Sequence, residues 1–369
     1  MKNLVCLALG MLLADCAGLS FQKTHAGEPT LTRTVILPGL RGTRPNVGVP
    51  GRIDHGAYDP TTGRLFVAAL ENGSLEVLDL EKGERVGSVT NLIRPQGAAV
   101  VPSLSCAVVA CGGDGSIHVL DTRTLAETRT FILGPDADNV RYDAIHDTIL
   151  ISYGNTNQGA IAVFDPHNWT KLREFSFASR PESFQLDPAG NRLFANLPKG
   201  VKAIEDGAVA VVNLKDGTPL ARIQLKGRAR NFPMAFDAAH QRLFVASRRP
   251  ARLIEIDTRS YEIIGDTPCT DDSDDLFYDA KHNQVLVVGG GFRPDLQTPE
   301  SISPCSPSGD IGAIDAFSLG PKGELTRSST TPSAPHARTG LFVPARDSLY
   351  LFVSFHGGHD AEIREYRAH

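Results

Sequence analysis

The chain has 369 residues, 41% of them hydrophobic and 21% charged, with a formal net charge of −5. This is the composition of a globular protein long enough for a sizeable core, and its 35 glycines and 24 prolines indicate frequent turns. The small negative charge argues against a broad surface for nucleic acid or anionic membrane, so no nucleic-acid partner is expected.

The N-terminus has the features of a signal peptide. A lysine precedes the apolar run Leu4–Ala14, and small and polar residues follow it. The sequence predicts a signal peptide within residues 1–26, cleaved after Gly18 or Ala26. A lipoprotein anchored through Cys16 is the alternative, although an acidic residue directly before that cysteine fits such a signal poorly. Since no later apolar run is long enough to cross a bilayer, we expect a periplasmic or secreted protein without a membrane span.

The rest of the chain repeats one short motif. Asp136–Asp143 reads DADNVRYD, and similar strings stand at 52–59, 180–187 and 272–279. Alignment on the aspartate that ends the motif gives seven repeats, most of them about 42 residues apart. Their first strands run through Asp54–Ala68, Gln96–Ala110, Asp138–Ser152, Glu182–Asn196, Phe232–Ala246, Asp274–Val288 and Arg338–Phe352.

Each repeat contains four short strands separated by turns. A polar turn follows the first strand, an apolar second strand comes next, and a Gly-rich turn leads to the third. Third strands are predicted to end in an aspartate or asparagine, at Asp79, Asp121, Asp165, Asn213, Asp257 and Asp315. Of these, Asp79, Asp121, Asp165 and Asp257 are predicted to cap the following turn. Four strands per repeat, without helical periodicity, predict an all-β propeller.

The two ends of the chain complete one blade. The seventh repeat ends with Glu362–Tyr366 as its third strand, and Thr32–Leu37 supplies the missing fourth strand. An N-terminal strand in the last blade closes the ring and removes exposed sheet edges. The sequence therefore predicts a single seven-bladed β-propeller over residues 32–369, and we expect it to be a monomer.

The repeats contain motifs that end in Tyr-Asp, second strands that read Arg-Leu-Phe-Val, and third strands that end in Val-Leu-Asp. In these features they resemble the repeats of the YVTN-type bacterial β-propellers, which are WD-repeat-like in architecture. The resemblance covers nearly the whole mature chain. The strings at 136–143, 181–187, 231–237, 272–281 and 337–344 are similar to an exported subset of that family. The resemblance implies the fold and export, and it implies no reaction. The sixth repeat departs from the pattern, because a long insertion replaces a short turn.

Four cysteines lie within the repeats. Cys106 and Cys111 stand at the two ends of one predicted strand, roughly 16 Å apart, which is too far for a disulfide. Cys269 and Cys305 both belong to the sixth repeat, and export would permit a disulfide between them. The sequence leaves open whether these two cysteines pair.

The strongest functional signal is a ring of residues at the start of the first strands. These strands line the central channel of a propeller, so the residues five positions before the last aspartate of the motif should meet at one mouth. The ring positions are Asp54, Gln96, Asp138, Glu182, Phe232, Asp274 and Arg338. With their neighbours, the predicted ligand-binding residues are Asp54, His55, Asp138, Asn139, Glu182, Asp274, Asp275 and Arg338.

This ring has three interpretations: it ties neighbouring blades together, binds a polar organic ligand, or holds a cation. Clustered carboxylates raise one another's pKa unless a cation or Arg338 neutralises them. Hard oxygen ligands suit Ca²⁺ or Mg²⁺, and His55 leaves a transition metal open. The candidate metal ligands are Asp54, Asp138, Glu182 and Asp274.

Two insertions, Lys199–Gly207 and Gly289–Gly312, should overhang the same mouth, where long loops on a rigid scaffold commonly bind. Two other polar features are weaker candidates. His356–His359 is interpreted as a polar turn, and the basic Arg248–Arg252 as a solvated turn rather than an anion site.

The leading hypothesis is an exported binding or scaffold protein that holds a small ligand, a cation or a partner protein at this mouth. The alternative is an enzyme at the same place, a metal-assisted lactone hydrolase or a lyase. In that case a carboxylate or His55 would act as general base and Arg338 would stabilise the oxyanion. The alternative rests on analogy between propeller folds.

Overall fold

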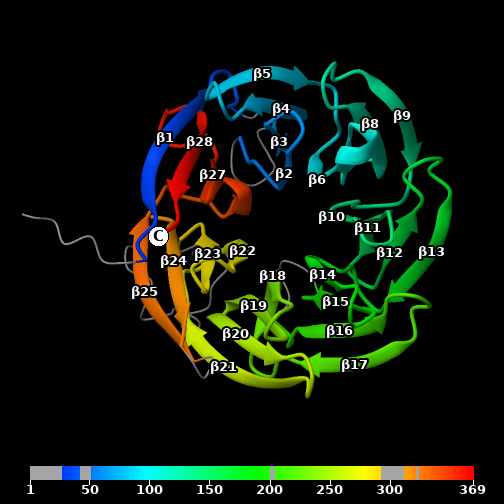
Figure 1. Cartoon of the computed structure of the whole chain (residues 1–369), viewed down its shortest axis with the longest axis vertical. Helices are drawn as coiled ribbons and strands as arrows, with labels where there is room; N and C mark the ends of the chain where they lie inside the picture. The colour runs from blue at the N-terminus through cyan, green and yellow to red at the C-terminus, as the bar shows by residue number, and fades with distance from the viewer. Residues whose placement is uncertain (1–26, 42–50, 200–203, 292–310, 321–323) are drawn as a thin grey trace, which may run out of the picture.

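The computed structural model describes residues 27–41, 51–199, 204–291, 311–320 and 324–369. Its strands form seven four-stranded antiparallel sheets, which surround a common centre (Figure 1). This arrangement confirms the predicted seven-bladed β-propeller. The predicted signal peptide and Cys16 lie outside the described residues. Cys305 also lies outside them, so its disulfide with Cys269 stays a prediction.

Each of the first six blades is built from four strands that are consecutive in the chain. Blades 1 and 2 contain β2 (Gly56–Asp59), β3 (Arg64–Ala69), β4 (Ser74–Asp79), β5 (Glu84–Val89), β6 (Pro95–Val101), β7 (Cys106–Cys111), β8 (Ser116–Asp121) and β9 (Glu127–Ile132). Blades 3 and 4 contain β10 (Val140–Asp143), β11 (Thr148–Asn155), β12 (Gln158–Phe164), β13 (Lys171–Phe177), β14 (Phe184–Asp187), β15 (Arg192–Leu197), β16 (Ala208–Asn213) and β17 (Pro219–Gln224). Blades 5 and 6 contain β18 (Ala229–Asp237), β19 (Arg242–Arg249), β20 (Ala251–Asp257), β21 (Glu262–Pro268), β22 (Ser273–Asp279), β23 (Gln284–Gly289), β24 (Ala313–Leu319) and β25 (Leu325–Pro332).

Blade 7 joins the two ends of the chain. It contains β26 (Thr339–Val343), β27 (Ser348–Val353) and β28 (Ala361–Arg367), and its outermost strand is β1 (Thr30–Leu37). β1 runs antiparallel to β28, from Thr30 opposite Arg367 to Leu37 opposite Ala361, and the two strands lie side by side in Figure 1. The predicted closure is confirmed, and the closing strand begins slightly before the predicted Thr32.

The hydrophobic core lies between adjacent blades. Leu65 and Val67 of blade 1 pack with Phe352 and Ile363 of blade 7, and similar clusters join other neighbouring blades. Second and third strands are buried on both faces because a blade lies on each side, which explains their continuous apolar runs. Each fully buried Leu, Val, Ile or Phe stabilises the fold by about 1.5–3 kcal/mol, so these interfaces hold the first strands firmly around the centre.

The third-strand aspartates cap the following turns as predicted, by accepting hydrogen bonds from backbone N–H groups: Asp79, Asp121, Asp165 and Asp257. The prediction that Asp315 ends its third strand was wrong. That residue lies inside β24, which continues to Leu319. Its buried carboxylate accepts hydrogen bonds from the N–H and hydroxyl of Thr270, at 2.6 and 2.9 Å.

In the described part of the chain there is no α-helix, and short 3₁₀ turns follow two of the first strands. None of these helices is long and apolar enough to cross a membrane.

Candidate ligand-binding site at the channel mouth

The seven predicted ring positions line one cavity. This cavity, the ring pocket, has a volume of about 310 Å³, and its lining also includes His55. The ring side chains are buried: Asp54, Gln96, Asp138, Glu182, Phe232, Asp274 and Arg338. The structure therefore brings together residues from all seven blades that the repeat alignment had placed at one level.

Backbone hydrogen bonds set this level. Asp54, Asp138 and Glu182 each donate the amide N–H to a carbonyl in the second strand of the same blade, at 2.8, 2.9 and 3.0 Å. The carbonyls of the next residues, His55 and Asn139, accept from the same strands at 3.0 and 2.9 Å. Because this pairing recurs in blades 1, 3 and 4, their ring side chains leave the backbone at the same height around the channel.

Sequence reasoning missed four arginines that line the pocket: Arg52, Arg94, Arg180 and Arg248. The first three stand two residues before a ring position, so the same alignment read two positions earlier would have found them. The interpretation of Arg248 as part of a solvated turn was wrong. Its side chain is buried, and its Nε donates to the carbonyl of Ser273 at 2.7 Å.

Arg180 holds three carboxylates on one side of the pocket. Its Nε lies 3.2 Å from Asp136 Oδ2, its Nη1 2.7 Å from Asp138 Oδ2, and its Nη2 contacts Glu182. Buried charges require partners of this kind. Burial raises the pKa of Glu182, an effect that Arg180 opposes and Asp138 and Asp274 reinforce. Glu182 therefore keeps its proton to a higher pH than an ordinary glutamate.

Two arginines hold Asp274 on the other side of the pocket. Arg248 Nη2 lies 2.5 Å from its Oδ1, and Arg338 Nε lies 3.1 Å from its Oδ2. Both guanidinium groups also contact Asp272, at 3.3 and 3.0 Å. Burial alone would raise the pKa of Asp274, but Arg248, Arg338 and Arg52 outweigh it and hold that pKa below its usual range. Arg338 is therefore part of a buried ion-pair network.

His55 is paired with Asp275. Its Nδ1 lies 3.2 Å from Asp275 Oδ2, and its Nε2 lies 3.8 Å from Asp54 Oδ1. Burial alone would lower the pKa of His55, but the charge and hydrogen bond of Asp275, with the charges of Asp54 and Asp138, raise it to about 10. The imidazole is therefore protonated at neutral pH and cannot accept a proton as a general base.

Each carboxylate predicted as a metal ligand contacts an arginine: Asp54, Asp138, Glu182 and Asp274. Guanidinium groups thus occupy the place that the sequence had suggested for a cation. The remaining predicted residue, Asn139, accepts a hydrogen bond from Arg141 Nη2 at 3.4 Å. Five arginines and five acidic residues line the ring pocket together with His55.

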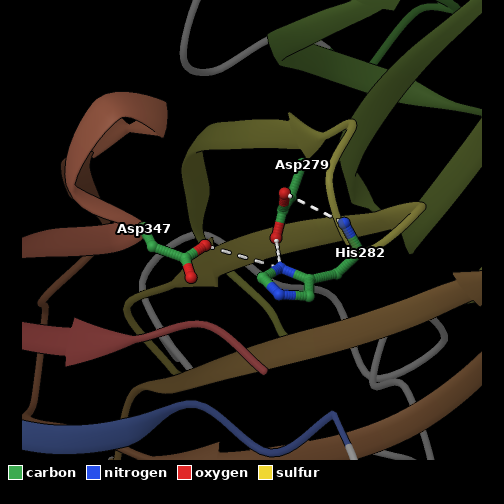
Figure 2. A group of neighbouring side chains, drawn as sticks. All are labelled: Asp279, His282 and Asp347. Atoms are coloured by element: carbon green, nitrogen blue, oxygen red, sulfur yellow. Dashed lines mark hydrogen bonds and ion pairs between the residues drawn. The ribbon is translucent and has the colours of Figure 1, made fainter.

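The group of described residues that has metal-ligand spacing lies elsewhere, between blades 6 and 7 (Figure 2). There His282 Nδ1 lies 2.6 Å from Asp279 Oδ2 and 3.6 Å from Asp347 Oδ1. The same Asp–His contact recurs at 2.7 Å in the corresponding turns of blades 3 and 5, and Lys281 already contacts Asp347. These observations indicate a turn structure that the repeat uses several times.

Arg94 differs from the other arginines of the ring pocket. Its hydrogen bond to Gln96 Oε1 is long, at 3.4 Å, its Nε is buried without a partner, and no carboxylate in the described part of the chain forms an ion pair with it. It also lines a neighbouring cavity of about 400 Å³, together with Asp136, Arg180 and Glu182. Arg94 therefore has hydrogen-bonding capacity left for a ligand.

The blade 6 insertion begins beside the ring. Gly290 donates its N–H to the carbonyl of Asp272 at 3.2 Å, and its own carbonyl accepts from His336 N–H at 2.9 Å. The central parts of this insertion and of the blade 4 insertion lie outside the described residues.

No family model and no curated protein sequence matches the chain. Solved structures match it in fold. A chain in the crystal structure of a mitotic checkpoint complex has a TM-score of 0.70 at 11% identity, over 99% of each chain. The Kuenenia stuttgartiensis hydrazine synthase has a TM-score of 0.70 at 15% identity, over 88% of this chain and 99% of that one. At these identities the likeness shows the fold alone, a β-propeller, and membership of the YVTN type stays a prediction.

Proposed function

We propose that the protein is an exported binding protein that holds a small polar organic anion in the ring pocket. The observation that carries the proposal is Arg94, a guanidinium without an ion-pair partner among the described residues, in a pocket whose other charges are paired. His55 lines the same pocket and is paired with Asp275. A carboxylate forms charge-assisted and often bidentate hydrogen bonds with a guanidinium group.

The other lining groups narrow the ligand class. The volume of about 310 Å³ lies at the lower end of the range for small-molecule pockets. Asp138 Oδ1 is buried without a hydrogen-bond partner, so the pocket also has an acceptor to offer. An anion that carries a hydroxyl or ammonium group, such as a hydroxy acid or an amino acid, satisfies both Arg94 and Asp138.

Thermal unfolding of the mature protein with malate, glycerate or glutamate tests this function. A ligand at 100 times its Kd should stabilise the fold by about 2.7 kcal/mol, and Arg94→Gln should abolish the stabilisation. Arg129→Gln, at an exposed arginine, is the matched control and should respond like the wild-type protein. Identical responses of the Arg94 variant and the wild type would overturn the assignment of Arg94.

Native mass spectrometry with metal analysis distinguishes a bound organic anion from the bound cation that the sequence suggested. A retained organic anion supports the proposal. A stoichiometric Ca²⁺ or Mg²⁺ that is lost in Asp138→Asn would instead favour a cation site.

One observation favours an enzyme as the second candidate. Glu182 is a buried carboxyl group in the pocket with a raised pKa, a property of general acids. In a lactone hydrolase or lyase, Glu182 would transfer the proton, because His55 is already protonated. Glu182→Gln would then keep ligand-induced stabilisation and lose turnover of a lactone such as γ-butyrolactone. Stabilisation of the wild-type protein by the hydroxy acids without any lactone turnover supports binding alone.

A further inference from the structure

A second cavity lies further along the first strands. This channel cavity has a volume of about 470 Å³, is lined by residues of all seven blades, and shares only His55 with the ring pocket. It reaches the ends of the first strands at Pro102 and Ala144. The two cavities therefore follow one another along the same central channel.

The walls of the channel cavity are mainly apolar and mostly small. Alanine, glycine and valine predominate among its apolar residues, and the longer aliphatic side chains come from blades 5, 6 and 7. The apolar lining includes Ala57, Ala98, Ala99, Val100, Met234, Leu276 and Leu341. This surface suits an aliphatic chain and offers little to a strongly hydrated molecule.

Most polar groups in this cavity already have partners. Asp275 Oδ2 lies 3.2 Å from His55 Nδ1 and accepts the N–H of Gly340 at 3.0 Å. Gln185 donates to the carbonyl of Met234 at 2.8 Å. His55, Asp275 and the side-chain amide of Gln185 therefore all have hydrogen-bond partners within the protein.

Arg141 is the exception. Its Nη1 donates to the carbonyl of Val140 at 2.9 Å, and its Nη2 lies 3.4 Å from Asn139 Oδ1 and 3.5 Å from Ser183 Oγ. A guanidinium group has five N–H donors, and no carboxylate among the described residues lies within ion-pair distance of this one. Its Cζ stands 5.6 Å from the ring centroid of Phe184. Burial lowers the pKa of Arg141, although Asp275 and Asp138 oppose the effect.

We propose that the channel cavity binds an unbranched aliphatic carboxylate of medium length, with the carboxylate on Arg141 and the chain against the apolar walls. A partly buried cation without a counter-ion is unfavourable, and a ligand carboxylate supplies the missing charge together with two parallel hydrogen bonds. Phe184 holds the guanidinium plane in place for that contact. This site is separate from the proposed polar anion site at Arg94.

Calorimetric titration of the mature protein with octanoate tests the proposal. We expect one saturable site, with acetate and 1-octanol each binding at least about tenfold more weakly, because one lacks the chain and the other the charge. Arg141→Gln should weaken octanoate binding by at least about tenfold. Arg94→Gln, the matched control at the ring pocket, should leave it unchanged.

Crystals soaked with 8-bromooctanoate give a readout that does not depend on the folding of a variant. Bromine density among the apolar walls of the channel cavity supports the proposal. Bromine density in the ring pocket, or octanoate binding that survives Arg141→Gln and fails in Arg94→Gln, would overturn it. Failure of hydroxy acids to bind would contradict only the proposed function of the ring pocket.

Discussion

Buried charge governs the behaviour of single residues at the channel mouth. Arg180 contacts three carboxylates, while Arg248 and Arg338 share two others. Removing one partner from a buried ion pair leaves an uncompensated charge, which costs more than the pair contributes. Individual arginines of the ring should therefore differ strongly in their effect on stability, according to how many carboxylates each one holds.

Arg180→Met should lower the free energy of unfolding by about 3–5 kcal/mol at pH 8, because Asp136, Asp138 and Glu182 lose their common cation. The loss should be smaller at pH 4.5, where these carboxyl groups can take up protons. Urea unfolding at the two pH values measures both effects.

Arg94→Met is the control for this experiment. Arg94 stands at the same position of its repeat, two residues before a ring position, and makes no ion pair in the described part of the chain. Its replacement should change the free energy of unfolding by less than about 1 kcal/mol. Equal losses in the two variants would show that the ion pairs of Arg180 do not stabilise the fold.

His55 should make stability depend on pH. Its pKa in the folded protein, about 10, lies above its ordinary value of 6.5, so its stabilising effect is complete below pH 6.5 and lost as the pH rises through 10. Within that window the wild-type protein should lose up to about 1.4 kcal/mol per pH unit more than His55→Gln. Urea unfolding at pH 6.5 and 9.5 measures the difference.

A histidine on the surface provides the comparison. His240 has a side chain that is 63% exposed, so His240→Gln should keep the pH dependence of the wild-type protein. If His55→Gln and His240→Gln lose stability equally between pH 6.5 and 9.5, the coupling of His55 to Asp275 is not the cause.

Among the elements, β1 has the most specialised task, because it completes a sheet whose other strands come from the opposite end of the chain. Burial in β1 is confined to its C-terminal end, and most of its other residues are exposed. Leu37 is fully buried in the cluster between blades 7 and 1, whereas Leu31 is 48% exposed. One strand thus offers two leucines in contrasting environments.

Leu37→Ala should cost about 2–5 kcal/mol of unfolding free energy, as expected for a buried leucine. Leu31→Ala, on the same strand, should stay within about 0.5 kcal/mol of the wild-type protein. Thermal and urea unfolding of both variants test whether β1 packs against the core. A small loss for Leu37→Ala would mean that this strand contributes little to closure.

At the scale of the whole molecule, closure joins blade 7 to blade 1 through residues that are far apart in sequence. In the closed ring β28 is paired on both sides, and β1 takes its place as the outer strand of blade 7. Without β1, strand β28 would present its backbone N–H and C=O groups to other chains.

A protein that begins at residue 38 should therefore unfold in a broader transition and associate through the exposed edge of β28, whereas one that begins at residue 30 should behave like one that begins at residue 27. Light scattering and calorimetry compare the two truncations. A monomeric, cooperative protein without β1 would show that closure is not needed for stability.

The repeat made the ring positions predictable, because backbone pairing depends on local patterns that the sequence shows directly. The same reasoning failed for Asp315, since β24 continues beyond it to Leu319. It also failed for Arg248, which comes from a second strand and reaches Asp274 across the blade interface. Such contacts depend on side chains from distant segments, which no repeat pattern contains.

The all-β class, the seven blades, the closing strand and the level of the ring follow from strand periodicity and turn residues, which recur in every repeat. The pairing of charges is visible in the folded protein alone: arginines neutralise the ring carboxylates, His55 is paired with Asp275, and Arg94 and Arg141 lack ion-pair partners in the described part of the chain. The physical reason is that charge pairing depends on distances of a few ångströms between side chains from different blades, and the fold alone sets those distances.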